Sequence, residues 1–498
     1  MYPATADLGS DDPPEPESTP AGVLEDGAQD AATEKLAAQV ARRIESHIID
    51  LGWPVGSVLG SVPELRERYG VSRAVLREAV RLTEHHQVTR MRRGAGGGLV
   101  VAAPDAGPAM RALVIYLEYV GLSVADLIEA RLLLEPIAAA IAAERVSEED
   151  IAELRQIVHA EVEHREEPDL DTQHRLHVQL GRMSGNPVLE LFVDVLTRLT
   201  ADRAYGTRKL TKAEIAEAKD HAHERHEAIA GAITAGDASR AAAEAADHLK
   251  HMAAWLLSRQ SPRRRASPRV PQPDSGAKLA EPVAARILAE IVRRNWPIGL
   301  VLGSESDLLA RYGISRSVLR EAVRILEYHS VARMRRGPGG GLVVTEPEAD
   351  ASIEAMALYL DYRKVSPEDL LVAREAIELG AVRKVVTRHD DPEVEERLRK
   401  AIERTGEPSA PGRTGGDYFH VELVRLTGNP VLGLFLQILT ELWTRHTATA
   451  SSPQHGADAV ATVEAVHNRI LEALLKGDED LTRHRMRRHL SALTAWYD

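Results

Sequence analysis

The chain has 498 residues with a net charge of −13, 44% apolar and 4% aromatic residues, and no cysteine. This length predicts about three or four domains, the Ala-, Leu-, Glu- and Arg-rich composition favours helices over sandwiches or barrels, and the charge argues against a uniformly basic coat for nucleic acid. Disulfides, thiolate zinc sites and cysteine nucleophiles are excluded, and because we find neither a membrane-length apolar run nor a signal pattern, we expect a cytoplasmic protein.

The N-terminal part of the chain changes from an acidic tail to a helical pattern. Residues 1–30 contain Asp, Glu and several Pro but no Lys or Arg, which predicts a disordered tail. Residues 33–51 place apolar side chains four apart, which predicts an amphipathic helix. A short helix is predicted next, because Ser61 and Glu64 have capping-box spacing and Gly70 ends the pattern.

A second helix and a hairpin follow, and both are rich in arginine. Ser72 is placed to cap the helix, and arginines four apart form a stripe beside its apolar face: Arg73, Arg77 and Arg81. Two short strand patterns are joined by a turn that holds Arg92 and Arg93. Residues 31–103 therefore predict a winged helix-turn-helix, whose second helix enters the DNA major groove. Its arginines can bind guanine or grip phosphate, and those of the turn can reach the backbone or minor groove. We expect the His85–His86 pair to be exposed.

Residues 109–258 are helical in pattern almost throughout, with Leu, Ile and Ala stripes between short breaks. This pattern predicts a bundle of six or seven helices. Three histidines stand on separate helices of that bundle: His177, His226 and His248. Residues 259–277 are rich in Pro, Ser and Arg, which predicts a linker.

After this linker the chain repeats itself. The run RYGVSRAVLREAVRL, which begins at Arg68, returns as RYGISRSVLREAVRI at Arg311, an offset of 243 residues that becomes 241 toward the end. Residues 278–345 therefore predict a second winged helix-turn-helix, and residues 351–498 a second helical domain. The predicted fold is mainly α: two copies of a winged helix-turn-helix domain followed by an all-helical effector bundle. The repeat keeps the residues singled out above: Ser315, Arg316, Arg320, Arg335 and Arg336 in the winged helix, and His420, His467 and His489 in the bundle.

Three histidines kept on three helices in both copies predict a metal site, because neutral imidazoles bind divalent ions and leave positions open for a ligand. A metal-dependent hydrolase that activates water at these sites is an alternative function. It requires a general base, and we find no His-Glu-x-x-His or comparable motif to supply one.

The run VSRAVLREAVRLTEHHQV and the upstream VGSVLGSVPEL resemble the winged-helix domain of GntR-type bacterial regulators. The resemblance implies that two arginines of each copy make the main DNA contacts: Arg73 and Arg77, and Arg316 and Arg320. The family often has Glu-Arg after the capping serine, where this chain has Val62-Pro63 and Glu305-Ser306. A DNA contact that this arginine commonly makes is therefore missing in both copies.

The segments DLIEARLLLEPIAAAIAAERVSEEDIAEL and SGNPVL resemble the FCD effector domain of the FadR-like branch of the same family. Many such domains hold Zn, Ni or Mn through one Asp and three His, and a small carboxylate completes the shell. The resemblance therefore implies a divalent metal ion, an organic-acid effector, and Arg131 and Arg374 facing that effector.

The fourth metal ligand departs from the pattern of the family. The family's Asp stands four residues before the first His, where this chain has Gln173 and Gly416. A spacing of three also puts a side chain on the same helix face, and His174 and Asp417 have that spacing. Either these two residues substitute as the fourth ligand, or metal binding is weakened.

The predicted function is that of a sequence-specific DNA-binding transcriptional regulator, a repressor, whose affinity for a double-stranded operator is controlled by a small organic acid at the histidine–metal site. Two arrangements are open. One chain can act as a built-in dimer, because the linker raises the effective concentration of the second copy, or two chains can pair. A winged helix that serves only assembly conflicts with the arginine pairs that both copies keep.

Overall fold

The computed structural model describes residues 22–94, 96–104, 106–164, 171–206, 211–258, 280–335, 337, 339–347, 349–405, 417–449 and 457–494. The predicted linker lies outside these residues, as does the predicted tail up to residue 21. Contacts divide the chain into two compact units, residues 1–103 and 104–498. A winged helix-turn-helix and a helical bundle each occur twice, which confirms the predicted fold class. Among the described helices, none is long and apolar enough to cross a membrane.

The first unit is a winged helix-turn-helix with a three-stranded antiparallel sheet. Its elements are α1 (Gly22–Asp50), β1 (Val58–Gly60), α2 (Val62–Tyr69), α3 (Arg73–His85), β2 (Thr89–Arg92) and β3 (Gly98–Val101). The strand order is β1-β3-β2, so the predicted hairpin is present and β1, which the sequence did not predict, adds a third strand. Helix α1 begins inside the predicted tail, because residues 21–30 include helix-forming Leu, Glu and Ala and no proline.

The predicted caps set the ends of the two helices that meet at the turn. The backbone N–H of Ser61 donates to Glu64 Oε2 at 2.7 Å, and Gly70 ends α2 in the left-handed conformation with φ of 64°. At the start of α3, Ser72 Oγ accepts the N–H of Val75 at 3.2 Å. These caps fix the tight turn that presents the N-terminus of α3.

At the end of α3 the structure differs from one prediction. The prediction that His86 is exposed is wrong: its Nδ1 lies 2.6 Å from Glu45 Oε1 of α1, and both side chains are buried. The buried carboxylate gives the imidazole a polar partner, so this histidine lies in the core where α1 packs against α3.

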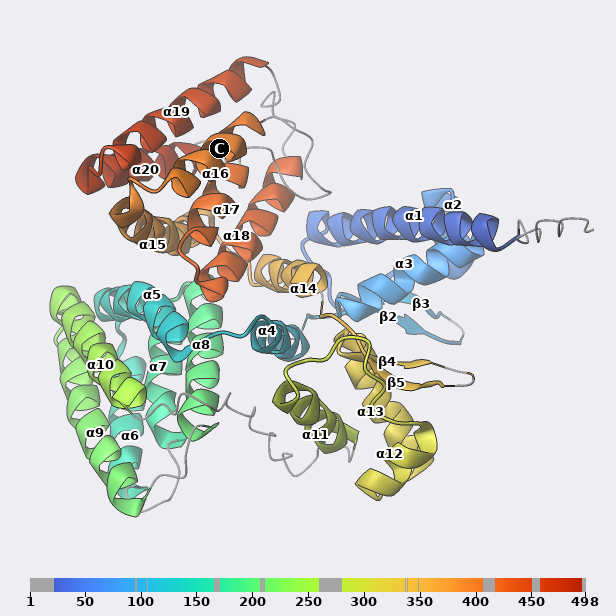
Figure 1. Ribbon diagram of the computed structural model, residues 1–498, viewed down its shortest axis with the longest axis horizontal. Helices are drawn as coiled ribbons and strands as arrows, with labels where there is room; N and C mark the ends of the chain where they lie inside the picture. Colours follow the sequence, from blue (N-terminus) through green and yellow to red (C-terminus); the bar gives the residue numbers. More distant parts are fainter. Residues whose placement is uncertain are drawn as a thin grey trace, which may run out of the picture. The chain divides into compact units, whose positions relative to one another are not determined.

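The described part of the second unit begins with seven helices, within the predicted number of six or seven, and Figure 1 labels each of them. They are α4 (Ala106–Val120), α5 (Val124–Arg145), α6 (Glu148–Glu163), α7 (Asp171–Met183), α8 (Pro187–Gly206), α9 (Lys212–Thr234) and α10 (Ala238–Ser258). Helix α5 is central, because it packs against α7, α8, α9 and α10. A side chain on its buried face therefore meets residues from several other helices.

The second copy repeats these elements. Its winged helix has α11 (Ala280–Arg293), α12 (Glu305–Tyr312), α13 (Arg316–Tyr328), β4 (Ala332–Arg335) and β5 (Gly341–Val344). Its bundle has α14 (Ala349–Tyr362), α15 (Pro367–Val385), the 3-10 turn η1 (Val386–Arg388), α16 (Pro392–Glu403), α17 (Asp417–Arg425), α18 (Pro430–Thr449), α19 (Ala457–Leu475) and α20 (Glu479–Thr494). An isolated bridge between Val301 and Val343 takes the place that β1 has in the first copy.

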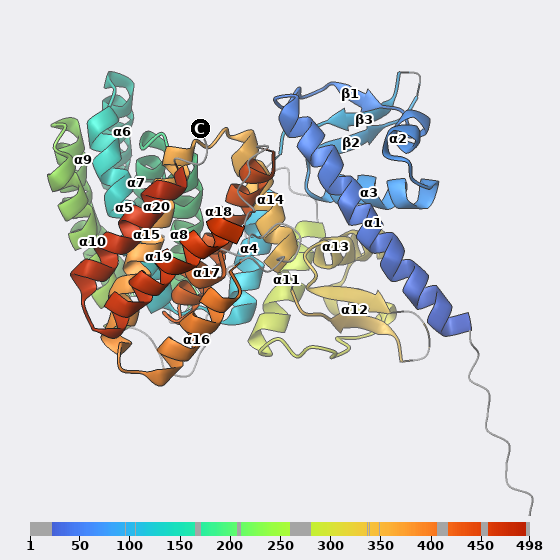
Figure 2. The same ribbon diagram turned by 90° about the horizontal axis from the view of Figure 1, so that it is seen from above.

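Helix α4 belongs to the first copy in sequence but packs on the second. Ile115 is buried in the core of the second winged helix. The ring of Tyr119 meets Trp296 edge-on, with centroids 5.5 Å apart, and its hydroxyl donates to Glu346 Oε1 at 2.8 Å. Helix α4 also packs against α14 of the second bundle (Figure 2). The sequence pattern predicts a helix here but not this partner.

The two bundles share one hydrophobic core. Phe192 of α8 stacks on Phe435 of α18 with ring centroids 3.8 Å apart, and the two residues are equivalent under the 243-residue offset. Two equivalent hydrogen bonds accompany this stack, each from an asparagine to a backbone carbonyl of the other copy: Asn186 Nδ2 to Asp369 O at 2.9 Å, and Asn429 Nδ2 to Asp126 O at 3.0 Å. Such reciprocal contacts are those of a two-fold interface, here formed within one chain.

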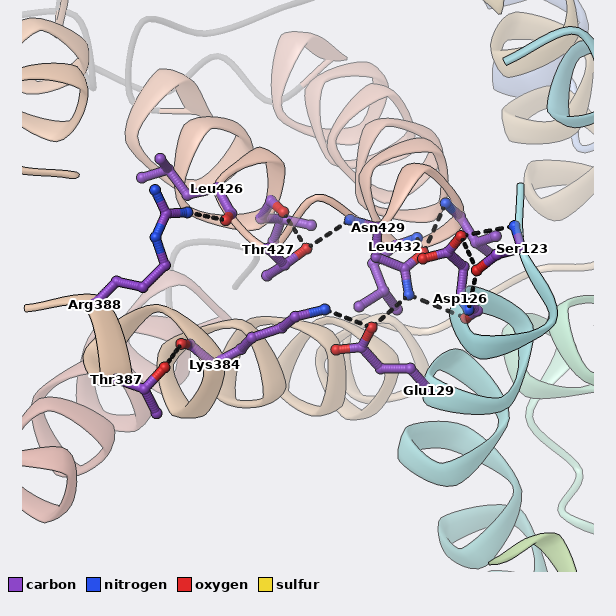
Figure 3. Close-up of polar contacts among 12 residues, drawn as sticks. Ser123, Asp126, Glu129, Lys384, Thr387, Arg388, Leu426, Thr427, Asn429 and Leu432 are labelled. Atoms are coloured by element: carbon purple, nitrogen blue, oxygen red, sulfur yellow. Dashed lines mark hydrogen bonds and ion pairs between the residues drawn. The ribbon is translucent and has the colours of Figure 1, made fainter. Parts of the chain in front are cut away.

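Other polar contacts between the bundles break this symmetry. Lys384 Nζ and Asn429 Nδ2 both donate to Glu129 Oε2, at 2.8 and 2.9 Å (Figure 3). Val372 stands where the second copy would need the equivalent of Glu129. The ion pair therefore favours pairing of unlike copies over pairing of like copies.

Candidate DNA interface and metal centres

Both recognition helices expose the side chains that the sequence selects for DNA. The exposed residues at their N-termini are Ser72, Arg73 and Arg77 on α3, and Ser315, Arg316 and Arg320 on α13. Ser315 caps α13 as Ser72 caps α3, with Oγ accepting the N–H of Val318 at 3.4 Å. Each helix thus presents a guanidinium pair at the end that enters a major groove in this motif.

One ion pair distinguishes the two recognition helices. Arg316 Nε lies 3.0 Å from Glu305 Oε1 of α12, whereas the first copy has the uncharged Val62 at the position of Glu305. Arg316 is exposed and Glu305 is half-buried, so this pair adds little to stability. The two helices therefore offer the same arginines in different surroundings.

The wing turns also carry arginines. Arg92 and Arg93 are exposed in the first copy, and Arg335 is exposed in the second. Arg92 Nη2 donates to Gly96 O at 2.8 Å, and Arg335 Nη2 donates to Gly339 O at 2.9 Å. These bonds brace each turn. Arg336, the remaining predicted DNA contact, lies outside the described residues.

Each bundle brings its three predicted histidines together. The two sets are His177, His226 and His248, and His420, His467 and His489; all six side chains are buried. Within each set the candidate ligand nitrogens lie within 4.8 Å of one another. The ring centroids are 4.7 to 5.2 Å apart in the first set and 4.8 to 5.1 Å apart in the second. The repeat has therefore produced two sites of one shape.

A buried Arg–Glu–His chain orients the first histidine. Arg131 donates to both oxygens of Glu135, and His177 Nδ1 lies 2.8 Å from Glu135 Oε2. Burial favours the protonated carboxyl, but Arg131 and His177 outweigh it and bring the pKa of Glu135 down to about 2. The carboxylate can only accept, so Nδ1 donates and Nε2 keeps the lone pair that a metal needs. The sequence alone does not reveal this role, although Glu135 follows Arg131 by four residues and recurs as Glu378.

The second set shows how well the donors fit an ion. Glu378 bridges Arg374 and His420, but among the described residues Arg374 donates to only one of its oxygens, and burial outweighs Arg374 and raises the pKa of Glu378. The three Nε2 atoms converge: His420 and His489 are 3.1 Å apart, His467 and His489 3.1 Å, and His467 and His420 3.3 Å. Three nitrogens that each bind an ion at about 2.1 Å are separated by ~3.0–3.4 Å in octahedral or tetrahedral geometry. The residues therefore fit a divalent metal ion.

The structure does not bring the predicted fourth ligands into these sets. Asp417 is buried, and its Oδ1 accepts from Arg374 Nη2 at 3.4 Å. His174 is half-buried on α7. Neither joins the groups whose ligand atoms lie within 4.8 Å of one another. Arg131 and Arg374, which were predicted to face the effector, are both buried.

The acid sensitivity of the metal-free protein follows from these buried imidazoles. Burial lowers the pKa of His177 to about 4 and that of His489 to about 3, against the pull of Glu135 and Glu378. Because these values lie below the unfolded value, the unfolded chain takes up protons first as the pH falls. We expect the free energy of unfolding to drop as the pH falls from the unfolded value of about 6.5 toward the folded values of about 4 for His177 and about 3 for His489, by up to about 1.4 kcal/mol per pH unit for each histidine.

Chemical denaturation of metal-stripped protein at several pH values measures this slope. H489Q removes one titrating group, so the unfolding free energy of this variant should fall less steeply with falling pH, by the contribution of one histidine. Equal slopes for this variant and the wild type would contradict the expectation.

Known proteins that resemble this chain correspond to one copy of it. The "Uncharacterized HTH-type transcriptional regulator Rv0494" of Mycobacterium tuberculosis is 28% identical over 40% of this chain and 83% of its own length. The "Exu regulon transcriptional regulator" of Escherichia coli is 25% identical over 43% of this chain and 82% of its own. The "HTH-type transcriptional regulator LutR" of Bacillus subtilis is 28% identical over 40% and 90%. Among solved structures, Streptococcus agalactiae GntR matches 44% of this chain and 99% of its own, with a TM-score of 0.33 and 22% identity.

Two family models match the chain, and each matches twice. "Bacterial regulatory proteins, gntR family" covers residues 36–97 and 279–342, within the two winged helices. "FCD domain" covers residues 126–251 and 369–492, within the two bundles. The chain is a member of the GntR family with FCD effector domains, a DNA-binding transcriptional regulator rather than an enzyme, and it carries both domains in duplicate.

Proposed function

We propose that this regulator is a repressor that binds its operator as a single chain, and that a small carboxylate held at a metal ion in the histidine sets controls its DNA affinity. The observation that carries the proposal is the pair of buried histidine sets, in each of which a carboxylate turns the first imidazole's Nε2 toward the other two histidines. Neutral imidazole nitrogens so arranged suit Zn, Ni or Mn. When bound, the metal ion supplies open coordination positions for an effector carboxylate.

Four further side chains complete the proposed sites. His174 and Asp417 stand one helical turn before the first histidine of their sets and are the proposed fourth ligands. Arg131 and Arg374 are the proposed effector contacts, because each is a buried guanidinium joined to a histidine through one carboxylate. A guanidinium in such a place favours an anionic ligand over a neutral one.

A packed path supports transmission from the effector site to DNA. Helix α5 carries Arg131 and Glu135, and α4 precedes it directly in the chain. Helix α4 is packed on the second winged helix through Ile115 and Tyr119. A ligand that favours one position of α5 would therefore shift the placement of a winged helix that belongs to the other copy.

The unlike surroundings of Arg73 and Arg316 support an operator with two unlike half-sites. Selection from a random duplex library, followed by footprinting of the selected duplexes, tests the proposal. We expect two motifs at a fixed spacing, one chain on each duplex, and release by members of a panel of mono-, di- and tricarboxylates when Zn²⁺ is present. Binding that is weak, steeply dependent on salt and indifferent to sequence would mean phosphate attraction alone and would overturn the proposal.

A further inference from the structure

His226, the second histidine of the first set, is hydrogen-bonded to a buried carboxylate. Glu161 of α6 is buried, and its Oε1 lies 2.6 Å from His226 Nδ1. Its other oxygen, Oε2, lies 3.0 Å from Nδ1 of His223, which is outside the histidine set. A carboxylate that accepts from His226 Nδ1 fixes the tautomer in which Nε2 carries the lone pair. That Nε2 is buried and has no hydrogen-bond partner among the described residues.

The second copy has lost this carboxylate. Counted from the N-caps, Thr405 corresponds to Glu161, because it follows Asp391 of α16 by as many residues as Glu161 follows Ser147 of α6. The 243-residue offset would give Arg404 instead, but Arg404 is exposed, whereas Thr405 is buried as Glu161 is. Thr405 Oγ1 and His467 Nδ1 are both buried, and neither has a hydrogen-bond partner within the described part of the chain. Phe419 stacks on the ring of His467, with centroids 4.5 Å apart, but among the described residues no hydrogen bond to Nδ1 selects the tautomer.

We propose that Glu161 is a positioning residue of the first metal centre that the second centre lacks, so that one chain holds two centres of different metal affinity. The inference rests on the metal binding proposed above. A partner on the second ring nitrogen orients the imidazole and raises its basicity, and losing such a partner typically costs 10- to 100-fold in metal affinity.

The second bundle has its own additional buried carboxylate, on a different helix. Asp417 of α17 accepts from Arg374, and the equivalent residue of the first copy is His174. The additional buried carboxylate therefore comes from α6 in the first bundle, as Glu161, and from α17 in the second, as Asp417. A homodimer of identical chains has identical sites, whereas the duplicated chain can load its two centres at two metal concentrations.

Reciprocal exchange of the two residues tests the inference on the full chain. We expect titration of metal-free protein with Co²⁺, followed by its visible absorption, and with Zn²⁺, followed by calorimetry, to show two binding steps. E161T should weaken one step by about 10- to 100-fold and leave the other unchanged. T405E should strengthen the other step by a similar factor, since the equivalent position of the first copy accommodates Glu. E161Q keeps an acceptor without the charge and should weaken the same step less than E161T does.

A matched control is E148Q, which neutralises an exposed carboxylate of the same helix and should change neither step. If both centres load metal and E161T changes neither affinity, the inference is overturned while the proposed function stands. If T405E does not fold, the metal affinities of E161T and E161Q, compared with that of the wild type, still test the inference. If the wild type binds no metal at either centre, metal control of the repressor fails, and this inference fails with it.

Discussion

Replacing Arg316 and Arg320 with Ala is expected to lower operator affinity by on the order of 100-fold or more, and R73A/R77A should do the same. A guanidinium that binds a guanine contributes about 1–3 kcal/mol of discrimination, and each variant removes two exposed guanidinium groups from one recognition helix. Both variants should be equally damaging if one chain uses both winged helices on one operator. Fluorescence anisotropy with the selected operator at fixed salt measures the loss.

The matched control removes two exposed arginines from the bundles. Arg198 and Arg399 are exposed and far in sequence from either winged helix, so R198A/R399A changes the net charge equally and should leave operator affinity within about twofold. The slope of log affinity against log salt should fall only in the recognition-helix variants, by about one for each phosphate that the protein no longer neutralises. An unchanged affinity for R316A/R320A would mean that the second winged helix does not contact the operator.

The sequence predicts the repeated units and the histidine sets well because both depend on local pattern and on repetition. The period of apolar residues specifies each helix, and the caps at Ser72 and Ser315 specify where the recognition helices begin. His177, His226 and His248 recur at nearly constant offsets between diverged neighbours, so a shared role can be inferred without any structure.

The sequence does not predict contacts between side chains that are far apart in the chain. The apolar face of α8 has the same pattern whether Phe192 packs within its own bundle or against Phe435. Tyr119 looks like an ordinary residue of an amphipathic helix, and only the fold brings it to Trp296. Glu161 is one of many glutamates on an amphipathic helix, and its burial behind His226 depends on how α6 packs against α9.

Replacing Phe192 with Ala is expected to cost about 3–5 kcal/mol of unfolding free energy and to loosen both bundles together. The ring lies on the ring of Phe435 in a core that both bundles share, so the cavity opens toward both copies. Hydrogen exchange read by mass spectrometry should therefore show faster exchange in α8 and in α18. F435A should give the same pattern, because its side chain forms the other half of the stack.

The double variant F192A/F435A tests whether the two bundles share one hydrophobic core or have two separate cores that only touch. Because the two rings contact each other, F192A/F435A should lower the unfolding free energy by less than the sum of the two single variants. Light scattering of the wild type should give the mass of one chain. L257A truncates an exposed side chain of α10 and should change stability by less than about 0.5 kcal/mol. Additive costs, with faster exchange only in the bundle that carries each change, would show that the bundles fold independently.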